Sequence, residues 1–186
     1  MRRTQTLKMA LAAMFLALGI LLPFLTANDP ALGRVLSLMH IPALLCGFVC
    51  GPAWGLAVGA VTPLLRSLLI GAPPMMPTAL AMAAELGVYG LMAGLLYRAL
   101  PKTPAGVVMT QVGAMLAGRL VWGVASFLLF TLFRDAYAQV IPAPFNLRFF
   151  LLAAFVTPWP GILLHLIVVP AAVLALQKAK FIPLPD

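Results

Sequence analysis

Three ionisable residues, Arg66, Glu85 and Arg119, lie inside stretches of sequence that are otherwise apolar and almost uncharged. A charged side chain at the centre of a membrane helix costs at least about 2.5–3.5 kcal/mol. Such residues therefore pair with one another, line a water-filled cavity or bind a solute. The chemistry available to an arginine and a glutamate is charge-assisted hydrogen bonding to a polar solute or to each other.

The stretches that position these residues are predicted to be membrane-spanning helices. With 63% hydrophobic and 9% charged residues in 186, and a mean hydropathy of +1.09, the chain is not an ordinary water-soluble domain. Each span needs roughly 20 apolar residues. We predict an all-α, six-helix transmembrane bundle forming a single domain over residues 1–186, with spans at residues 6–25, 36–49, 54–70, 78–100, 105–133 and 145–177, the last interrupted at residues 157–161.

The positively charged residues indicate how the bundle is oriented. Six spans place both chain ends on one side of the membrane, and basic residues are more numerous on that side. They are Arg2, Arg3, Lys8, Arg98, Lys102, Lys178 and Lys180, against Arg34, Arg134 and Arg148 on the other side. The positive-inside bias then places both termini in the cytoplasm. The net charge of +8 is read as this topology signal and not as a nucleic-acid-binding surface.

This topology predicts how deep in the membrane each polar residue lies. Glu85 lies about 10 Å below the outer surface at the helical rise of 1.5 Å per residue. Arg66 falls in the outer third of its helix, Arg119 falls near or just beyond the midplane, and His40 lies in the outer part. The inner halves of the helices are expected to be nearly featureless. This distribution predicts a pocket open to the outside and not a continuous channel.

Two interpretations of the charged residues stay open. Arg66 and Glu85 have opposite signs at similar depth, so they form a buried salt bridge or are two residues of the pocket. Arg119 has no second acidic residue in the membrane to neutralise it, which favours a water-filled cavity or an acidic ligand. His165 is expected to lie deeper than the other polar groups and to be structural.

Two tryptophans are further candidates. Trp122 lies one turn from Arg119, where its ring stacks on a flat ligand or fills space. Trp159 lies between Pro158 and Pro160, whose rings free backbone carbonyls within a helix. Broken helices of this kind line binding sites in transporters, and a simple kink is the alternative.

Small residues recur at four-residue spacing, which allows helices to approach closely in lipid. The glycines are expected to pack within the bundle, and the pair Ala13 and Ala17 could instead dock another membrane protein. The glycines concerned are Gly47, Gly51, Gly55, Gly59, Gly90 and Gly94. Cys46 and Cys50 are expected to be small packing residues, because an i,i+4 pair on a helix is poorly placed for a disulfide.

Catalytic motifs are absent from the sequence. It contains no H-E-x-x-H, no G-x-S-x-G and no glycine-rich phosphate loop, so we expect neither enzymatic activity nor ATP hydrolysis. No metal and no cofactor are expected.

Four segments together resemble the S components of energy-coupling factor (ECF) vitamin transporters. They are LMHIPALLCGFVCGP at residues 38–52, TPLLRSLL at 62–69, ELGVYG at 85–90 and AMFLA at 13–17. The last matches the AxxxA motif on helix one of the family, which implies that Ala13 and Ala17 dock a membrane T subunit. The resemblance extends over nearly the whole chain.

The resemblance implies a bacterial cell-membrane protein that captures a vitamin-like small molecule from outside and topples against the T subunit, driven by two ATPase subunits. Family pockets are built mainly from helices four to six and the outer loops. The matching residues are Glu85, Tyr89, Arg119, Trp122, Asn146 and Trp159, with Arg66 and His40 as less secure members.

The substrate stays open at this point. An arginine and a glutamate near aromatic rings suit a carboxylate such as pantothenate, and equally α-ribazole, a B6 vitamer, riboflavin or a queuine-like base. A self-sufficient homodimeric secondary carrier is the alternative function, and an intramembrane metal-dependent hydrolase is a third. Nucleic acid is not an expected partner.

Overall fold

The computed structural model describes residues 2–27, 29–141 and 144–180, and in these residues every regular element is helical. The longer elements run in chain order as α1 (Arg2–Leu21), α2 (Pro30–Leu36), α3 (His40–Cys50), α4 (Pro52–Ile70), α5 (Leu80–Ala99), α6 (Pro104–Leu132), α7 (Arg134–Val140), α8 (Leu147–Leu151) and α9 (Trp159–Lys178). Three single-turn segments extend α1, α5 and α8: η1 (Leu22–Thr26), η2 (Met75–Ala79) and η3 (Leu152–Val156).

Six of the described segments are long and apolar enough to cross a membrane, which confirms the predicted count. The second consists of α2 and α3, separated where Ser37 adopts a left-handed backbone (φ 50°). The predicted sixth span of residues 145–177 is interrupted as expected, at Thr157 and Pro158, but including residues 145–156 in the span was wrong. There, α8 and η3 form a separate short helix, and only α9, which restarts after Thr157 and Pro158, is long enough to span.

Local sequence fixes several helix ends. The Asp29 carboxylate accepts hydrogen bonds from the backbone N–H groups of Ala31 (2.7 Å) and Leu32 (3.0 Å) and caps α2. Thr103 caps α6 in the same way, with Pro104 in the first helical position. Such caps satisfy N–H groups that have no partner within the helix. They set the start of the second span and of α6.

Glycines bring α3, α4 and α5 into direct backbone contact. A Cβ added to Gly90 on α5 would lie 2.2 Å from the Gly55 carbonyl oxygen on α4, and one added to Gly59 would lie 2.1 Å from that of Leu86. Neither position accepts a larger residue unless the helices separate. The glycine repeats therefore pack within the bundle, as predicted.

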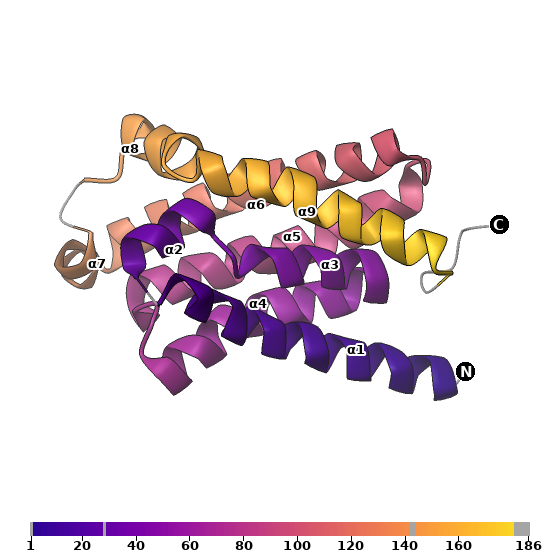
Figure 1. The fold of residues 1–186 in the computed structure, drawn as a ribbon. Helices are drawn as coiled ribbons and strands as arrows, with labels where there is room; N and C mark the ends of the chain where they lie inside the picture. Colours follow the sequence, from indigo (N-terminus) through magenta and orange to yellow (C-terminus); the bar gives the residue numbers. More distant parts are fainter. Residues whose placement is uncertain (1, 28, 142–143, 181–186) are drawn as a thin grey trace.

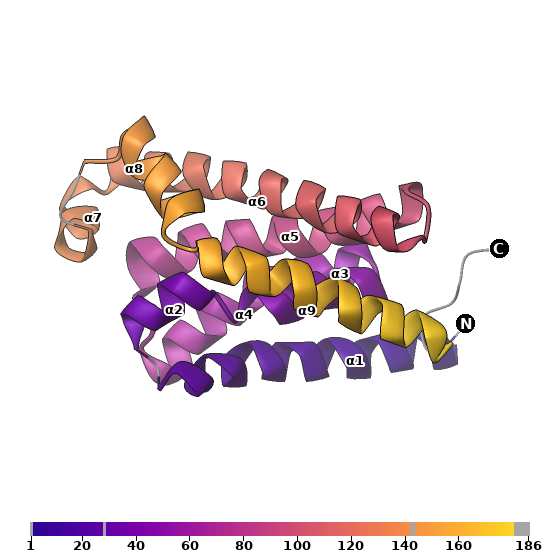
Figure 2. The ribbon, with the colours of Figure 1, turned by 45° about the horizontal axis from the view of Figure 1, so that its top comes forward.

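The remaining helices flank this unit on opposite sides. Ala12 and Phe15 of α1 pack against the cysteine side of α3 and against Val58 of α4, and Cys46 and Cys50 are free and buried, as expected. In Figures 1 and 2, α6 lies on the side of the bundle away from α1. The start of α1 and the end of α9 lie at one end of the molecule, and α2, α7 and α8 lie at the other (Figure 1). Because both termini are predicted to be cytoplasmic, we call the second end the outer end.

Candidate functional site

Five ionisable or polar side chains from four helices meet in the half of the bundle nearer the outer end. We call them the outer polar layer: His40 on α3, Glu85 and Tyr89 on α5, Arg119 on α6 and His165 on α9. All five are buried, and the most accessible, Arg119, is 6% exposed. The layer lies where the first turns of α3, α5 and α9 meet the middle of α6.

An ion pair forms the centre of the layer. Nη1 of Arg119 lies 2.8 Å from Oε1 of Glu85, and Nε2 of His40 lies 3.6 Å from the same oxygen. The partner of Glu85 is thus Arg119 and not the Arg66 suggested by similar depth. The expectation that Arg119 has no carboxylate to neutralise it was wrong.

The two histidines and Tyr89 complete the layer. Nδ1 of His40 lies 2.8 Å from the Ser37 carbonyl oxygen, and this nitrogen therefore carries the proton, because a carbonyl only accepts. The His40 ring stacks on His165 at a centroid distance of 5.8 Å and is tilted against Tyr89 at 5.3 Å. The expectation that His165 lies deeper than the other polar groups was therefore wrong.

The layer has hydrogen-bonding capacity that no described residue uses. In the described part of the chain, seven buried atoms of the layer have no hydrogen-bond partner: Nε and Nη2 of Arg119, Oε1 of Glu85 (apart from its ion pair), the Tyr89 hydroxyl, Nε2 of His40 and both ring nitrogens of His165. The backbone of Leu36 and Ser37 is close to His165 without forming a well-aligned bond. Buried polar groups without partners are uncommon in native proteins, and each requires an explanation.

Gly118 allows α6 to approach α5 closely beside the ion pair. Gly118 precedes Arg119 on α6, and a Cβ at this position would lie 2.0 Å from Cδ1 of Tyr89. Any larger residue would displace either the tyrosine ring or the helix. Gly118 thus sets the approach of α6 to α5 at the level of the ion pair.

Arg66 occupies a different place, although it is 4% exposed. Its Nε donates to the Ile20 carbonyl (3.4 Å) and its Nη1 to the Ala72 carbonyl, and the guanidinium lies 5.8 Å from the centroid of the Phe24 ring. Arg66 thereby joins the end of α1 and the η1 segment to the loop that follows α4. These contacts give it a structural role at the outer end.

The other candidates lie apart from the ion pair. Trp122 is half-buried and stacks on Phe150 at a centroid distance of 6.2 Å. Asn146 is exposed and caps α8 by accepting a hydrogen bond from the Phe149 N–H (2.8 Å). Trp159 is 60% exposed at the start of α9. Contact of these three residues with a substrate stays a prediction.

A second polar group lies in the inner half of the bundle, where few features were expected. We call it the inner polar layer: Tyr97 on α5, Thr110 and Gln111 on α6 and Gln177 on α9, all buried. Nε2 of Gln177 donates to the Tyr97 hydroxyl at 2.6 Å. The prediction of nearly featureless inner halves was wrong.

The inner layer borders the loop between α5 and α6. The Lys102 ammonium lies 4.5 Å from the centroid of the Tyr97 ring and donates to the Leu100 carbonyl at 3.1 Å. Desolvation by burial lowers the pKa of Lys102 from its usual value. An apolar level that includes Leu44, Ala93, Ala114, Met115 and Val169 separates the two layers.

A four-residue periodicity in the sequence marks both layers. Counting in steps of four from Glu85 gives Tyr89, Ala93 and Tyr97 on α5, and counting from His165 leads to Gln177 on α9. Gln111, Met115 and Arg119 follow the same spacing on α6. Residues four apart share one helix face, so this repeat could have identified the inward faces and the inner layer.

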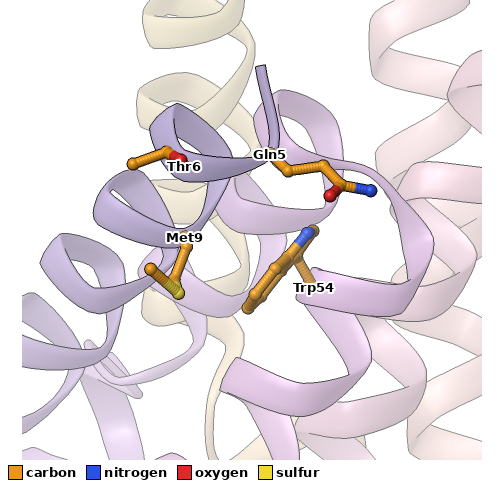
Figure 3. Close-up of a pocket in the computed structure, with 4 residues that line it drawn as sticks. All are labelled: Gln5, Thr6, Met9 and Trp54. Atoms are coloured by element: carbon orange, nitrogen blue, oxygen red, sulfur yellow. The ribbon is translucent and has the colours of Figure 1, made fainter. Parts of the chain in front are cut away.

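A hollow of about 490 Å³ opens away from both layers, between the start of α1 and the start of α4. Figure 3 shows Thr6 and Met9 on one side and the Trp54 ring on the other, with the Gln5 side chain extending above that ring. Ala13 and Ala17 are exposed on α1, one and two turns farther along the helix face of Met9. This line of small, accessible residues is on the outside of the bundle.

Hydrogen bonding and charge pairing are the chemistry that the outer layer can offer. Among the described residues, no three His, Cys, Asp or Glu side chains are grouped so as to hold a metal ion. The six spanning helices make the chain a multi-pass membrane protein.

Comparison with known families identifies the family of this chain. Residues 7–173 match the family described as ECF transporter, substrate-specific component, in agreement with the resemblance found in the sequence. No curated protein and no solved structure matches the chain. The match extends from the first turns of α1 to the last turns of α9, and the chain therefore belongs to the substrate-specific components of energy-coupling factor transporters.

Proposed function

We propose that this protein, acting as a single domain over residues 1–186 in a bacterial cell membrane, captures a vitamin or vitamin precursor from outside at the outer polar layer. The observation that carries the proposal is the buried Glu85–Arg119 pair, joined by groups from two further helices that have unused hydrogen-bonding atoms. Charged residues inside membrane segments are retained mainly for function. The pair lies nearer the outer end, the side from which a substrate of an importer arrives.

The outer layer is covered by the start of α9 and the end of α2. A Cβ added to Gly161 on α9 would lie 2.5 Å from the Val35 carbonyl oxygen on α2. His40 is likewise held by the Ser37 carbonyl at the break between α2 and α3. We expect the substrate to enter where these segments meet, since their backbones separate the two histidines from the outer end.

Energy for release is expected to come from partner subunits. Ala13 and Ala17 are exposed on α1, and small residues allow close contact between helices in a membrane. The hollow beside Met9 continues this face toward the inner end (Figure 3). We propose that this face docks the T subunit, which carries two ATPase subunits, and that the bound protein topples in the membrane to deliver the substrate.

The docking face can be tested with a matched control. Tryptophan at both Ala13 and Ala17 should abolish uptake by the assembled transporter and leave substrate binding by the isolated protein unchanged. Tryptophan at both Leu120 and Val124, which are also four residues apart and each 61% exposed on α6, should leave uptake intact. Normal uptake with the α1 variant would exclude docking at this face.

Reconstitution in liposomes separates this function from that of a secondary carrier. The protein alone should bind its substrate but not accumulate it under an imposed proton or sodium gradient, because the sequence has no phosphate loop and the inner layer has no ionisable pair. Adding the T and ATPase subunits with ATP should produce concentrative uptake. Accumulation by the protein alone would instead establish a self-sufficient carrier.

A further inference from the structure

The guanidinium of Arg119 pairs with Glu85 through one nitrogen, and the Tyr89 hydroxyl is close to it without forming a well-aligned hydrogen bond. Its Nη1 lies 2.8 Å from Glu85, and its Nε and Nη2 have no hydrogen-bond partner in the described structure. Nε and Nη2 share one edge of the planar guanidinium, with their N–H groups nearly parallel. That edge matches the two oxygens of a carboxylate or phosphate.

We propose that this free edge of Arg119 binds a carboxylate of the substrate through two parallel hydrogen bonds, so the substrate class is a vitamin-sized monocarboxylic acid. The inference rests on the proposed function, because it requires that a substrate reaches the outer polar layer. It narrows the substrate to one ionic class, where the sequence left acids and nitrogenous rings equally open.

The surroundings of Glu85 argue against a cationic substrate. Its Oε1 already faces Arg119 at 2.8 Å and His40 at 3.6 Å, and the Tyr89 hydroxyl is close to the same carboxylate. The Arg119 guanidinium, the His40 ring and Tyr89 thus crowd the only carboxylate in the layer, although its Oε1 accepts no well-aligned hydrogen bond from them. An ammonium group would have to displace one of them.

Charge balance favours a carboxylate over a phosphate. The layer contains one carboxylate and one guanidinium, with two buried histidine rings beside them. A monoanion adds a single negative charge, whereas a phosphate monoester brings nearly two into a site shielded from water. The cost of burying charge without a counter-charge rises steeply. The Tyr89 hydroxyl, which is close to Arg119, offers an additional donor, and the His165 ring has two further nitrogens without partners among the described residues.

The test begins with the small molecules that the protein retains. Wild type, Arg119→Lys and Arg66→Lys are purified as full chains from the same cells and denatured, and the released molecules are identified by mass spectrometry before and after methyl esterification. Lysine keeps the charge but lacks the two-donor edge. Arg66→Lys is the matched control, because Arg66 is equally buried but lies outside the layer.

The expected result is a molecule that gains a single methylene unit, co-purifies with wild type and Arg66→Lys, and is depleted in Arg119→Lys. Titrated against ligand-free wild type, its methyl ester should bind about 10- to 100-fold more weakly than the acid, the ratio expected when charged hydrogen bonds are lost. This titration uses only the wild-type protein, so it decides the matter even if a variant fails to fold.

Different outcomes separate the two proposals. A retained molecule that has no carboxylate, that carries phosphate instead, or whose ester binds as tightly as the acid overturns the monocarboxylate assignment and leaves capture of a substrate in place. If wild type retains no small molecule and no cell extract stabilises it against thermal unfolding, the proposed function itself is overturned.

Discussion

The outer and inner polar layers are built from the same three helices, α5, α6 and α9, yet they differ in chemistry. The outer layer adds α3, contains the Glu85–Arg119 ion pair and leaves one edge of the guanidinium without a partner. The inner layer is uncharged, and its clearest contact is the 2.6 Å hydrogen bond from Gln177 to Tyr97. Position along one set of helices therefore separates ionisable chemistry from neutral polar packing.

The groups without hydrogen-bond partners differ in charge between the two layers. Thr110 and Gln111 in the inner layer also have atoms without partners among the described residues, but they are neutral. Leaving a buried neutral group unpaired costs about 1–3 kcal/mol, and a charged group costs more. A free guanidinium edge is therefore harder to explain by folding alone, which favours a ligand for the outer layer and a packing role for the inner one.

The largest expected difference between the layers concerns the ion pair. Glu85→Gln should lower the free energy of unfolding by about 3–5 kcal/mol, because it leaves the buried Arg119 charge without a counter-charge. Unfolding by denaturant in detergent micelles, followed by circular dichroism, measures this. Combining Glu85→Leu with Arg119→Met should recover most of the stability, since both charges are then removed. A Glu85→Gln protein as stable as wild type would show that the pair is already hydrated.

A smaller effect is expected when the geometry of the outer layer is changed but its charges are kept. Gly118→Ala should destabilise the protein by about 1–3 kcal/mol through overpacking and weaken substrate binding, because the added methyl group would lie 2.0 Å from the Tyr89 ring. Gly113→Ala on the same helix is the control. Its Cβ meets only the flexible end of Leu96, at 2.8 Å, so both stability and binding should change little. Equal effects of the two variants would remove the special role of Gly118.

The smallest effects are expected in the inner layer. Gln177→Leu removes the donor to Tyr97 and should cost about 0.6–1.7 kcal/mol, the range found for hydrogen bonds between membrane helices. Gln111→Leu should be close to neutral, because the Gln111 carbonyl oxygen has no partner in the described structure and its amide nitrogen donates only a weak hydrogen bond to Sδ of Met115, at 3.8 Å. Both proteins should bind the substrate as wild type does. Weakened binding in either variant would extend the substrate site into the inner half.

Hydropathy and residue count predicted how deep along the helices each residue lies. They gave the six spans and the similar depth of His40, Glu85 and Arg119, and the four-residue spacing of the glycines predicted their packing role. Depth depends on residue count along a helix, which the sequence contains directly. This part of the site was therefore accessible before the structure.

The direction in which each side chain points was much harder to predict. The spans are apolar on nearly all sides, so no polar face marks which side is buried, and Arg66 was as plausible a partner for Glu85 as Arg119. The contact between Tyr97 and Gln177 joins residues 80 apart in the chain, a pairing that depends on how α9 returns to the bundle. Only the four-residue spacing carried that information.

The most direct test of the outer layer as the binding site is calorimetry with the released substrate on two folded variants. One removes the ion pair (Glu85→Leu with Arg119→Met) and the other removes the inner-layer amide (Gln111→Leu), each verified to unfold cooperatively. We predict that the first loses at least about 100-fold in affinity, as expected when two or more charge-assisted hydrogen bonds disappear, and that the second binds as wild type. Wild-type affinity in the variant without the ion pair would contradict the assignment.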